Sequence, residues 1–258
     1  MNSNPSVAIC IPAYNHGKYL PNLFRSILDQ TYPNLQIFFS DDGSTDNTAQ
    51  IANEWFPRLK QRFSDVTFVR SLFNAGDLGY TNAKTITGMV TSADYIQICD
   101  SDDYFKPDKI EKQISYLRAN PEFSAVHTDV EAQYEDGTSC LRFWKTYRNT
   151  QTPGKPDIPV GFIRQHLEHC NFIYTCAMLV RTDLFKKHNR FDYFLKDLDL
   201  GFGDYPFFLS LSKEAQIGYI DEPLSVYRVL SESVSHSNRQ WVVEKTELIK
   251  KFAREGAF

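Results

Sequence analysis

The sequence contains no apolar run long enough to cross a bilayer, and its first six residues include neither a basic charge nor an apolar stretch. A membrane-spanning helix needs about 20 apolar residues, and a secretory signal peptide needs a basic start followed by an apolar segment. We therefore expect neither a transmembrane helix nor a signal peptide. Internal repeats and low-complexity tracts are also absent from the sequence. The length of 258 residues allows one large domain or two small ones. We expect a single domain over residues 1–258, with the proline- and glycine-rich stretch at 135–159 as an insertion loop and not a domain boundary.

Basic residues are not in excess, because 28 Lys and Arg stand against 32 Asp and Glu, for a net charge of -4. A nucleic-acid-binding protein usually carries a basic surplus, so we expect no nucleic-acid partner. The five cysteines are odd in number and scattered. This pattern argues against a disulfide framework and favours reduced thiols in a cytoplasmic protein.

Apolar runs of strand length alternate with helical patterns through the first hundred residues. Strands are expected at 7–11, 35–39, 66–69 and 95–99, and helices at 19–30, 45–55 and 78–90. This alternation predicts an α/β protein with a mostly parallel sheet flanked by helices. Ligands bind such sheets beyond the carboxyl ends of the strands, so the residues after each strand are the first candidates for a site.

Beyond residue 103 the pattern changes. Helices are expected at 110–117, 205–212 and 241–253, strands at 123–130, 172–180 and 217–220, and a proline- and glycine-rich loop at 135–159. The last helix is apolar on one side and carries several basic residues elsewhere. This pattern fits either packing onto the domain or a peripheral membrane contact.

Three carboxylates, Asp100, Asp102 and Asp103, directly follow the strand expected at 95–99. Like charges this close resist ionisation unless a positive charge lies between them, and a divalent cation is the simplest such partner. Mg²⁺ is usually held by one or two carboxylates together with substrate phosphates. The alternative is the N-terminus of the following helix, but one cap needs only one aspartate. The cluster therefore favours a metal-phosphate site.

Four segments place polar residues after expected strands or at the start of a helix. They are Pro12-Ala13-Tyr14-Asn15, Ser40-Asp41-Asp42-Gly43-Ser44-Thr45-Asp46, Asp100-Ser101-Asp102-Asp103 and Gly203-Asp204-Tyr205-Pro206-Phe207-Phe208-Leu209. In this order and spacing they resemble the motifs of the family 2 glycosyltransferases. The resemblance implies a GT-A fold, a Rossmann-like sheet with a smaller acceptor-side subregion. It also implies a nucleotide-diphosphate sugar donor, a divalent metal (Mn²⁺ or Mg²⁺) and inversion at the anomeric carbon.

With this resemblance, residues 1–104 are expected to bind the nucleotide sugar and residues 105–258 the acceptor. The expected nucleotide contacts are Pro12, Ala13, Tyr14, Asn15, Asp42, Asn74, Gly76, Lys84, Asp100, Ser101 and Asp102. Tyr14 offers a ring that can stack on a base, or it is simply an aromatic residue at the rim. Asp42 occupies the position that contacts the nucleobase in the family, although Asp-Gly is also a turn signal. Lys84 is either a phosphate contact or a solvated surface lysine.

The resemblance assigns the metal to Asp102 or Asp103, and His236 is a further candidate contact that could equally be an exposed loop histidine. Asp204 occupies the position of the catalytic base, which takes the proton of the acceptor hydroxyl. The alternative for Asp204 is a helix N-cap, and Asp197 and Asp199 are the fallback candidates for the base.

The sequence thus predicts an inverting glycosyltransferase that uses a UDP-sugar and acts in bacterial surface polysaccharide synthesis. Its acceptor is expected to be a glycan or a lipid-linked molecule, in the cytoplasm or at the inner face of the membrane. Two alternatives stay open. A sugar-phosphate nucleotidyltransferase would carry a glycine- and lysine- or arginine-rich signature after the first strand, which residues 12–15 do not provide. A catalytically silent binding module could lack the metal carboxylates or the base, and this sequence has both.

Overall fold

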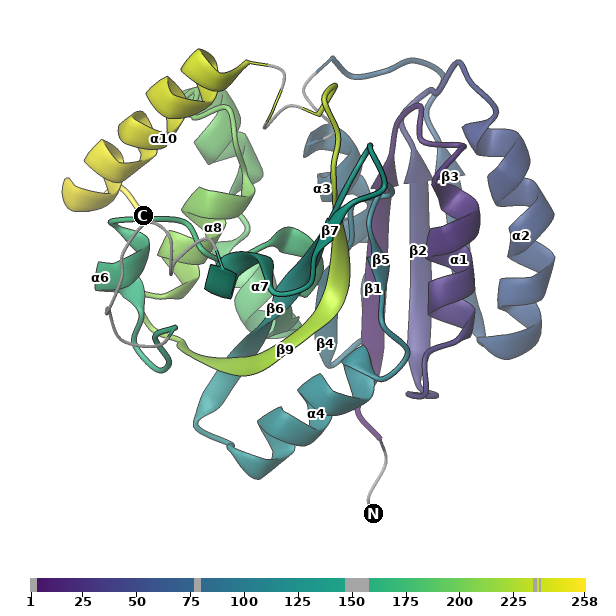
Figure 1. Ribbon diagram of the computed structural model, residues 1–258, viewed down its shortest axis with the longest axis horizontal. Coiled ribbons are helices and arrows are strands. Elements are labelled where there is room, and N and C mark those ends of the chain that lie inside the picture. The colour runs from purple at the N-terminus through teal and green to yellow at the C-terminus, as the bar shows by residue number, and fades with distance from the viewer. Residues whose placement is uncertain (1–3, 77–79, 147–157, 234–235, 237) are drawn as a thin grey trace.

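The computed structural model describes residues 4–76, 80–146, 158–233, 236 and 238–258, and one mixed sheet runs through both halves of this part of the chain (Figure 1). The strands follow the order β3-β2-β1-β4-β8-β6-β9-β5, with β7 beside β6. Their bounds are β1 Val7–Ala13, β2 Leu35–Asp41, β3 Asp65–Arg70, β4 Tyr95–Ile98, β5 Tyr104–Phe105, β6 Phe123–Tyr134, β7 Ser139–Cys140, β8 Leu179–Arg181 and β9 Gln216–Val229. Because β1 to β4 are parallel, their carboxyl ends meet at one edge of the sheet.

Helices cover both faces of the sheet. They are α1 Leu20–Leu28, α2 Thr48–Arg62, α3 Tyr80–Gly88, α4 Lys109–Ala119, α6 Arg164–Leu167, α7 Thr182–His188, α8 Asp204–Leu211 and α10 Arg239–Arg254. Figure 1 shows α1 and α2 beside the first strands, and α6, α8 and α10 at the opposite end of the molecule. Within β1, Val7 and Ile9 pack into the core under α1, α2 and α4, whereas Ala8 packs into a second core under α3, α7 and α8. Burial on both faces explains why these strands are continuous apolar runs.

The alternation predicted for the first hundred residues is confirmed, and β1 to β4 each begin within one residue of the prediction. The helix expected at 45–55 continues to Arg62 as α2. Residues 78 and 79 of the helix expected at 78–90 lie outside the described residues, as does the segment 147–157 of the expected loop at 135–159.

The strand expected at 172–180 is wrong for most of its length. Only its last residues belong to β8, and Thr175–Ala177 form a single turn of 3-10 helix. Side chains from elsewhere bond its backbone in place of a neighbouring strand. The side-chain amide of Gln97 donates to the carbonyl of Thr175 at 3.0 Å, and the hydroxyl of Ser225 donates to the carbonyl of Cys176 at 2.8 Å. Such distant partners cannot be recognised in a local apolar pattern.

Gly43, in the turn after β2, is expected to be the glycine least tolerant of substitution. Its φ of 69° is left-handed, and a Cβ there would lie 2.6 Å from the carbonyl carbon of Phe73. Strain and overlap together predict that Gly43→Ala lowers the free energy of unfolding by more than about 2 kcal/mol in a urea titration. Gly137→Ala is the matched control, because φ is 84° there and no atom lies within 4 Å of the added Cβ. Equal losses for both variants would contradict the packing argument.

Candidate active site

A cavity of about 1040 Å³ opens at the carboxyl ends of β1 and β4. Its lining comes from both halves of the chain, because α8 and the segment 170–176 face the residues that follow β1 and β4. Most of the predicted site residues line it: Pro12, Ala13, Tyr14, Asn74, Gly76, Asp100, Ser101, Asp102, Asp103, Asp204 and His236. The structure therefore brings together residues that are far apart in the sequence.

Residues 100–103 form the turn after β4, called the acidic turn below, and this turn is held against β9. The backbone N–H of Asp103 donates to the carbonyl of Asp100 at 3.0 Å, which closes the turn. The backbone N–H of Arg228 in β9 donates to Oδ1 of Asp103 at 2.9 Å. Directly after the turn, β5 pairs with β9, which anchors the acidic residues to the sheet from both sides.

Negative charge is concentrated in the cavity, because Asp100, Asp102, Asp103 and Asp204 all line it. Burial raises the pKa of Asp100 to about 7, and the charges of Asp102 and Asp204 contribute to the shift. The pKa of Asp103 is raised well above its ordinary value by burial and by the charges of Asp102 and Asp100. Asp204, a hundred residues further along the chain, is thus close enough to Asp100 to interact with it. This repulsion is the electrostatic signature of a site that gains stability from a bound cation.

The oxygen donors fit a divalent cation held together with a ligand. Asp102 lines the cavity, and within the described residues its carboxylate has no hydrogen-bond donor and no ion pair, whereas Asp103 accepts from the backbone of Arg228 and from the thiol of Cys176. No group of three metal-ligating side chains forms a complete site in the described part of the chain. One or two carboxylates plus diphosphate oxygens would then complete the coordination, which is the usual arrangement for Mg²⁺. Asp102 is the better placed ligand of the predicted pair.

Asp204 is the first residue of α8, and its half-buried side chain lines the same cavity. Burial raises the pKa of its carboxyl group, although the backbone N–H of Tyr205 acts in the opposite direction. A carboxylate with a raised pKa is a stronger general base. Asp197 and Asp199, the fallback candidates, are absent from the lining of this cavity.

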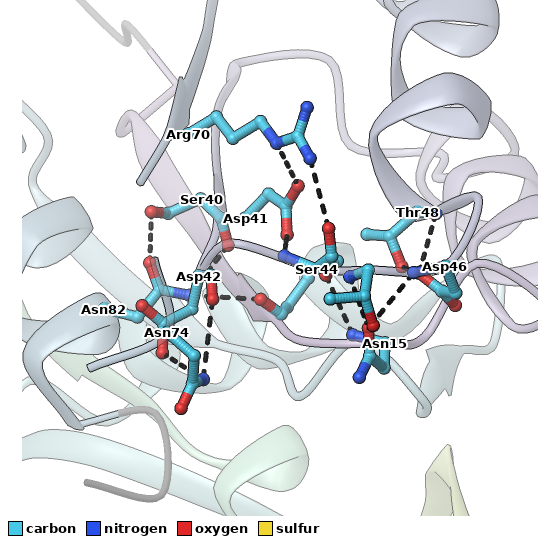
Figure 2. Close-up of polar contacts among 12 residues, drawn as sticks. Asn15, Ser40, Asp41, Asp42, Ser44, Asp46, Thr48, Arg70, Asn74 and Asn82 are labelled. Carbon is cyan, nitrogen blue, oxygen red and sulfur yellow. Dashed lines mark hydrogen bonds and ion pairs between the residues drawn. The ribbon is translucent and has the colours of Figure 1, made fainter. Parts of the chain in front are cut away.

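Asp42 forms hydrogen bonds with the loop at residues 74–76, and Figure 2 shows its contact with Asn74. Its carboxylate accepts the side-chain amide of Asn74 at 2.8 Å and the backbone N–H of Ala75 at 3.3 Å, and Asp42 is only 1% exposed. It is not part of the cavity lining, whereas Asn74 and Gly76 are. In this arrangement Asp42 presents the 74–76 loop to the cavity instead of facing it directly.

Two further predicted residues lie outside the large cavity. Asn15 has a left-handed φ of 53°, and its Oδ1 accepts the backbone N–H of Thr45 at 2.8 Å (Figure 2), so it holds the turn after β2. Lys84 forms an ion pair with Asp192 and lines a separate, smaller cavity. Its position on the exposed side of α3 explains why it does not reach the acidic turn.

His236 lines the rim of the large cavity, and its Nε2 lies 3.4 Å from the hydroxyl of Tyr227. Burial and the positive charge of Arg239 lower its pKa, which favours the neutral imidazole. A neutral imidazole is the form that can bind a metal.

Sequence reasoning missed His16 and Asn82, which both line the cavity. Nδ1 of His16 lies 2.8 Å from the hydroxyl of Ser101, and the side-chain amide of Asn82 donates to the carbonyl of Ser40 at 2.8 Å. The guanidinium of Arg228 lies 5.1 and 4.8 Å from the ring centres of Tyr19 and Tyr104, which places a positive charge in the acidic cavity. His16 follows directly after the predicted 12–15 segment, which was the one local signal available.

Lys109, the first residue of α4, is a buried ammonium group. It is 0% exposed, and its Nζ donates to Oε1 of Gln97 and of Gln113 at 2.5 and 2.7 Å. Burial lowers its pKa from 10.5 to about 7. Between these two values the unfolded chain binds one more proton than the folded protein, so this group makes stability rise with pH, by up to about 1.4 kcal/mol per pH unit.

We therefore expect Lys109→Met to flatten the pH dependence of stability. The test is the free energy of unfolding, measured by urea titration at several pH values from about 7 to about 10. The advantage of the wild type over the variant should grow as the pH rises through this window. A difference between the two proteins that stays constant with pH would contradict the lowered pKa.

The fold matches that of solved glycosyltransferases. A mannosyltransferase from Pyrobaculum calidifontis in complex with GDP-Man and Mn²⁺ superposes with a TM-score of 0.69 at 16% identity, over 100% of this chain and 66% of that one. TarS of S. aureus in complex with UDP-GlcNAc gives a TM-score of 0.63 at 17% identity, over 90% of this chain and 61% of that one. The fold is therefore GT-A, as predicted.

The sequence comparisons give the family. The model for glycosyl transferase family 2 matches residues 8–187, and the chain belongs to this family of glycosyltransferases. An uncharacterized glycosyltransferase of Haemophilus influenzae is 29% identical over 258 residues, which are 99% of this chain and 74% of that protein. The hyaluronan synthase of Pasteurella multocida is 31% identical over 141 residues, but the match spans 54% of this chain and only 13% of the synthase.

Among the helices of the described residues, none has both the length and the apolar character that crossing a bilayer requires.

Proposed function

We propose that the protein transfers one sugar from a UDP-sugar to a hydroxyl of a glycan or lipid-linked acceptor, with inversion, in the synthesis of a bacterial surface polysaccharide. One observation carries this proposal: the carboxylates of the acidic turn and the carboxylate of Asp204 face one cavity built from both halves of the chain. The likeness to TarS, solved with UDP-GlcNAc, and to hyaluronan synthase supports the donor and the product class.

The nucleotide sugar is assigned to the side of the cavity formed by the first half of the chain. Pro12, Ala13 and Tyr14 provide its wall at the end of β1, and Tyr14 is 40% exposed, which leaves its ring free to stack on a base. The 74–76 loop, held by Asp42, adds backbone groups. Arg228 also lines the cavity, and its guanidinium can form an ion pair with the negatively charged diphosphate.

The metal site is assigned to Asp102, with Asp103 and His236 as the further candidate ligands. A bound Mn²⁺ or Mg²⁺ would stabilise the negative charge that develops on the departing diphosphate. Asp103 contributes through its hydrogen bond with Arg228, which fixes the turn that carries Asp102.

Asp204 is assigned as the general base. It takes the proton of the acceptor hydroxyl while the acceptor oxygen forms a bond to the anomeric carbon, and the bond between that carbon and the diphosphate oxygen breaks. The nucleoside diphosphate leaves with the electron pair. Attack from the face opposite the diphosphate inverts the anomeric configuration.

The compartment assigned to this reaction is the cytoplasm, including the inner face of the membrane. All five cysteines are free thiols, and three of them are buried. Free cysteines of this kind are typical of proteins from reducing compartments.

The test is nucleotide release from a panel of UDP-Glc, UDP-Gal, UDP-GlcNAc and GDP-Man, with and without Mn²⁺. We expect release from one of the UDP-sugars, dependent on Mn²⁺ and faster when a glycan acceptor is added. Release from GDP-Man alone would contradict the UDP assignment. No release from any donor would favour a catalytically silent binding module.

A further inference from the structure

We propose that a second, smaller cavity beside the active site binds a neighbouring sugar ring of the acceptor. This inference rests on the proposed function, because it assigns a carbohydrate to the acceptor. The cavity has a volume of about 220 Å³, about a fifth of the volume of the large cavity.

The small cavity adjoins the large one between the 74–76 loop and the segment that leads to Asp204. Gly76 and Phe191 line both cavities. Phe202, two residues before Asp204, lines the large cavity and packs edge-on against Trp241 of the small one, with ring centres 5.1 Å apart. An acceptor whose hydroxyl lies at Asp204 can therefore extend past Phe202 into the small cavity.

The wall of the small cavity is locally irregular. Tyr193–Asp197 form a turn of π-helix, and Asp199 has a left-handed φ of 48°. Lys245 holds this conformation, since its Nζ donates to the carbonyl and to Oδ2 of Asp199 at 2.5 and 2.8 Å. Gly201 is also left-handed, and a Cβ there would lie 2.7 Å from the ring of Trp241. Backbone irregularities of this kind lower the stability of the fold, and they are concentrated at functional sites.

The chemistry of the lining suits a hydroxyl-rich, uncharged ligand. Trp241 offers an aromatic surface, on which the apolar face of a sugar ring can pack. Around it are two ammonium groups, Lys84 and Lys196, and two carboxylates, Asp192 and Asp199. Both lysines pair with Asp192, so no charge of one sign dominates the cavity. The lysines can donate to sugar hydroxyls and the carboxylates can accept from them.

The chain's three tryptophans, Trp55, Trp144 and Trp241, allow a direct test. Trp241 reports on the small cavity and Trp144 on the large one, while Trp55 lies on α2 against Arg25 and Arg58. The indole N–H signals are followed by NMR during titration with the methyl glycosides of glucose, galactose, mannose and N-acetylglucosamine. Concentrations reach about 100 mM, because a ligand this small binds weakly.

We expect at least one glycoside to shift the Trp241 signal saturably and to leave Trp55 unchanged. Thr81→Phe, which fills the cavity from α3, should weaken this response at least tenfold. Thr85→Phe, one turn further along the same helix and outside the lining, should preserve it. Unchanged Trp55 and Trp144 signals verify that both variants are folded. The inference is overturned if no glycoside moves Trp241, or if Thr81→Phe responds like the wild type.

UDP with Mn²⁺ separates this inference from the proposed function. We expect this pair to bind in a calorimetric titration. Binding of UDP and Mn²⁺ without any response of Trp241 to the glycosides would overturn the sugar subsite and leave the donor site standing. A response of Trp241 to a glycoside without calorimetric binding of UDP and Mn²⁺ would support the subsite and contradict the donor site.

Discussion

Asp204→Asn is expected to abolish sugar transfer while the protein still binds its donor. The amide cannot take the proton of the acceptor hydroxyl, and the loss of a general base typically lowers the rate by about 10²–10⁴-fold. The substitution also removes one of the two charges that raise the pKa of Asp100. Affinity for UDP with Mn²⁺ should therefore be equal to that of the wild type or slightly higher. The measurements are kcat for transfer and calorimetric titration with UDP and Mn²⁺.

Asp197→Asn is the matched control for this prediction. Asp197 is an exposed aspartate seven positions earlier and does not line the large cavity. We expect this variant to keep near-normal turnover. Near-normal turnover of Asp204→Asn would show that another group accepts the proton, and loss of UDP binding in Asp204→Asn would show that the residue acts on the donor.

Asp102→Asn is expected to remove the dependence on metal. Its carboxylate lines the cavity and has no protein partner within the described residues, so the folded structure should not depend on its charge. A metal acting as a Lewis acid contributes several kcal/mol, so turnover should fall by about 10³-fold. Affinity for UDP in the presence of Mn²⁺ should fall to its metal-free value. Turnover and calorimetric affinity, each with and without Mn²⁺, are the measurements.

Asp108→Asn controls for the loss of one negative charge in the same region. Asp108 forms an ion pair with Lys112 2.7 Å away and does not line the cavity. We expect this variant to keep the metal dependence of the wild type. If Asp102→Asn also kept it, Asp103 or Asp100 would have to hold the cation.

The parallel half of the fold could be predicted because each strand carries its own signal. β1, β2 and β4 are largely apolar and mostly buried, and polar residues mark where each ends. Since parallel strands end at one edge, the sequence also pointed to the residues that follow each strand as the candidates for a site, and Tyr14 after β1 and Asp102 after β4 both line the cavity.

The second half depends on contacts that no local pattern contains. The segment 172–178 is bonded by Gln97 and Ser225 instead of a strand, and the acidic turn is fixed by Arg228, more than a hundred residues away. The same limit applies to Asp42. Its motif predicted a contact with the nucleobase of the donor. Whether the carboxylate faces a ligand or a neighbouring loop depends on the position of Asn74, 32 residues further on.

The most direct test of the account is a calorimetric titration of UDP into the wild-type protein in the presence of Mn²⁺, repeated after the metal has been removed with a chelator. The account predicts saturable binding that requires the metal, because the carboxylates at the end of β4 repel one another and would repel a diphosphate without it. Binding of equal affinity without metal, or no binding heat with it, would contradict the claim that these aspartates hold a cation that in turn holds the diphosphate.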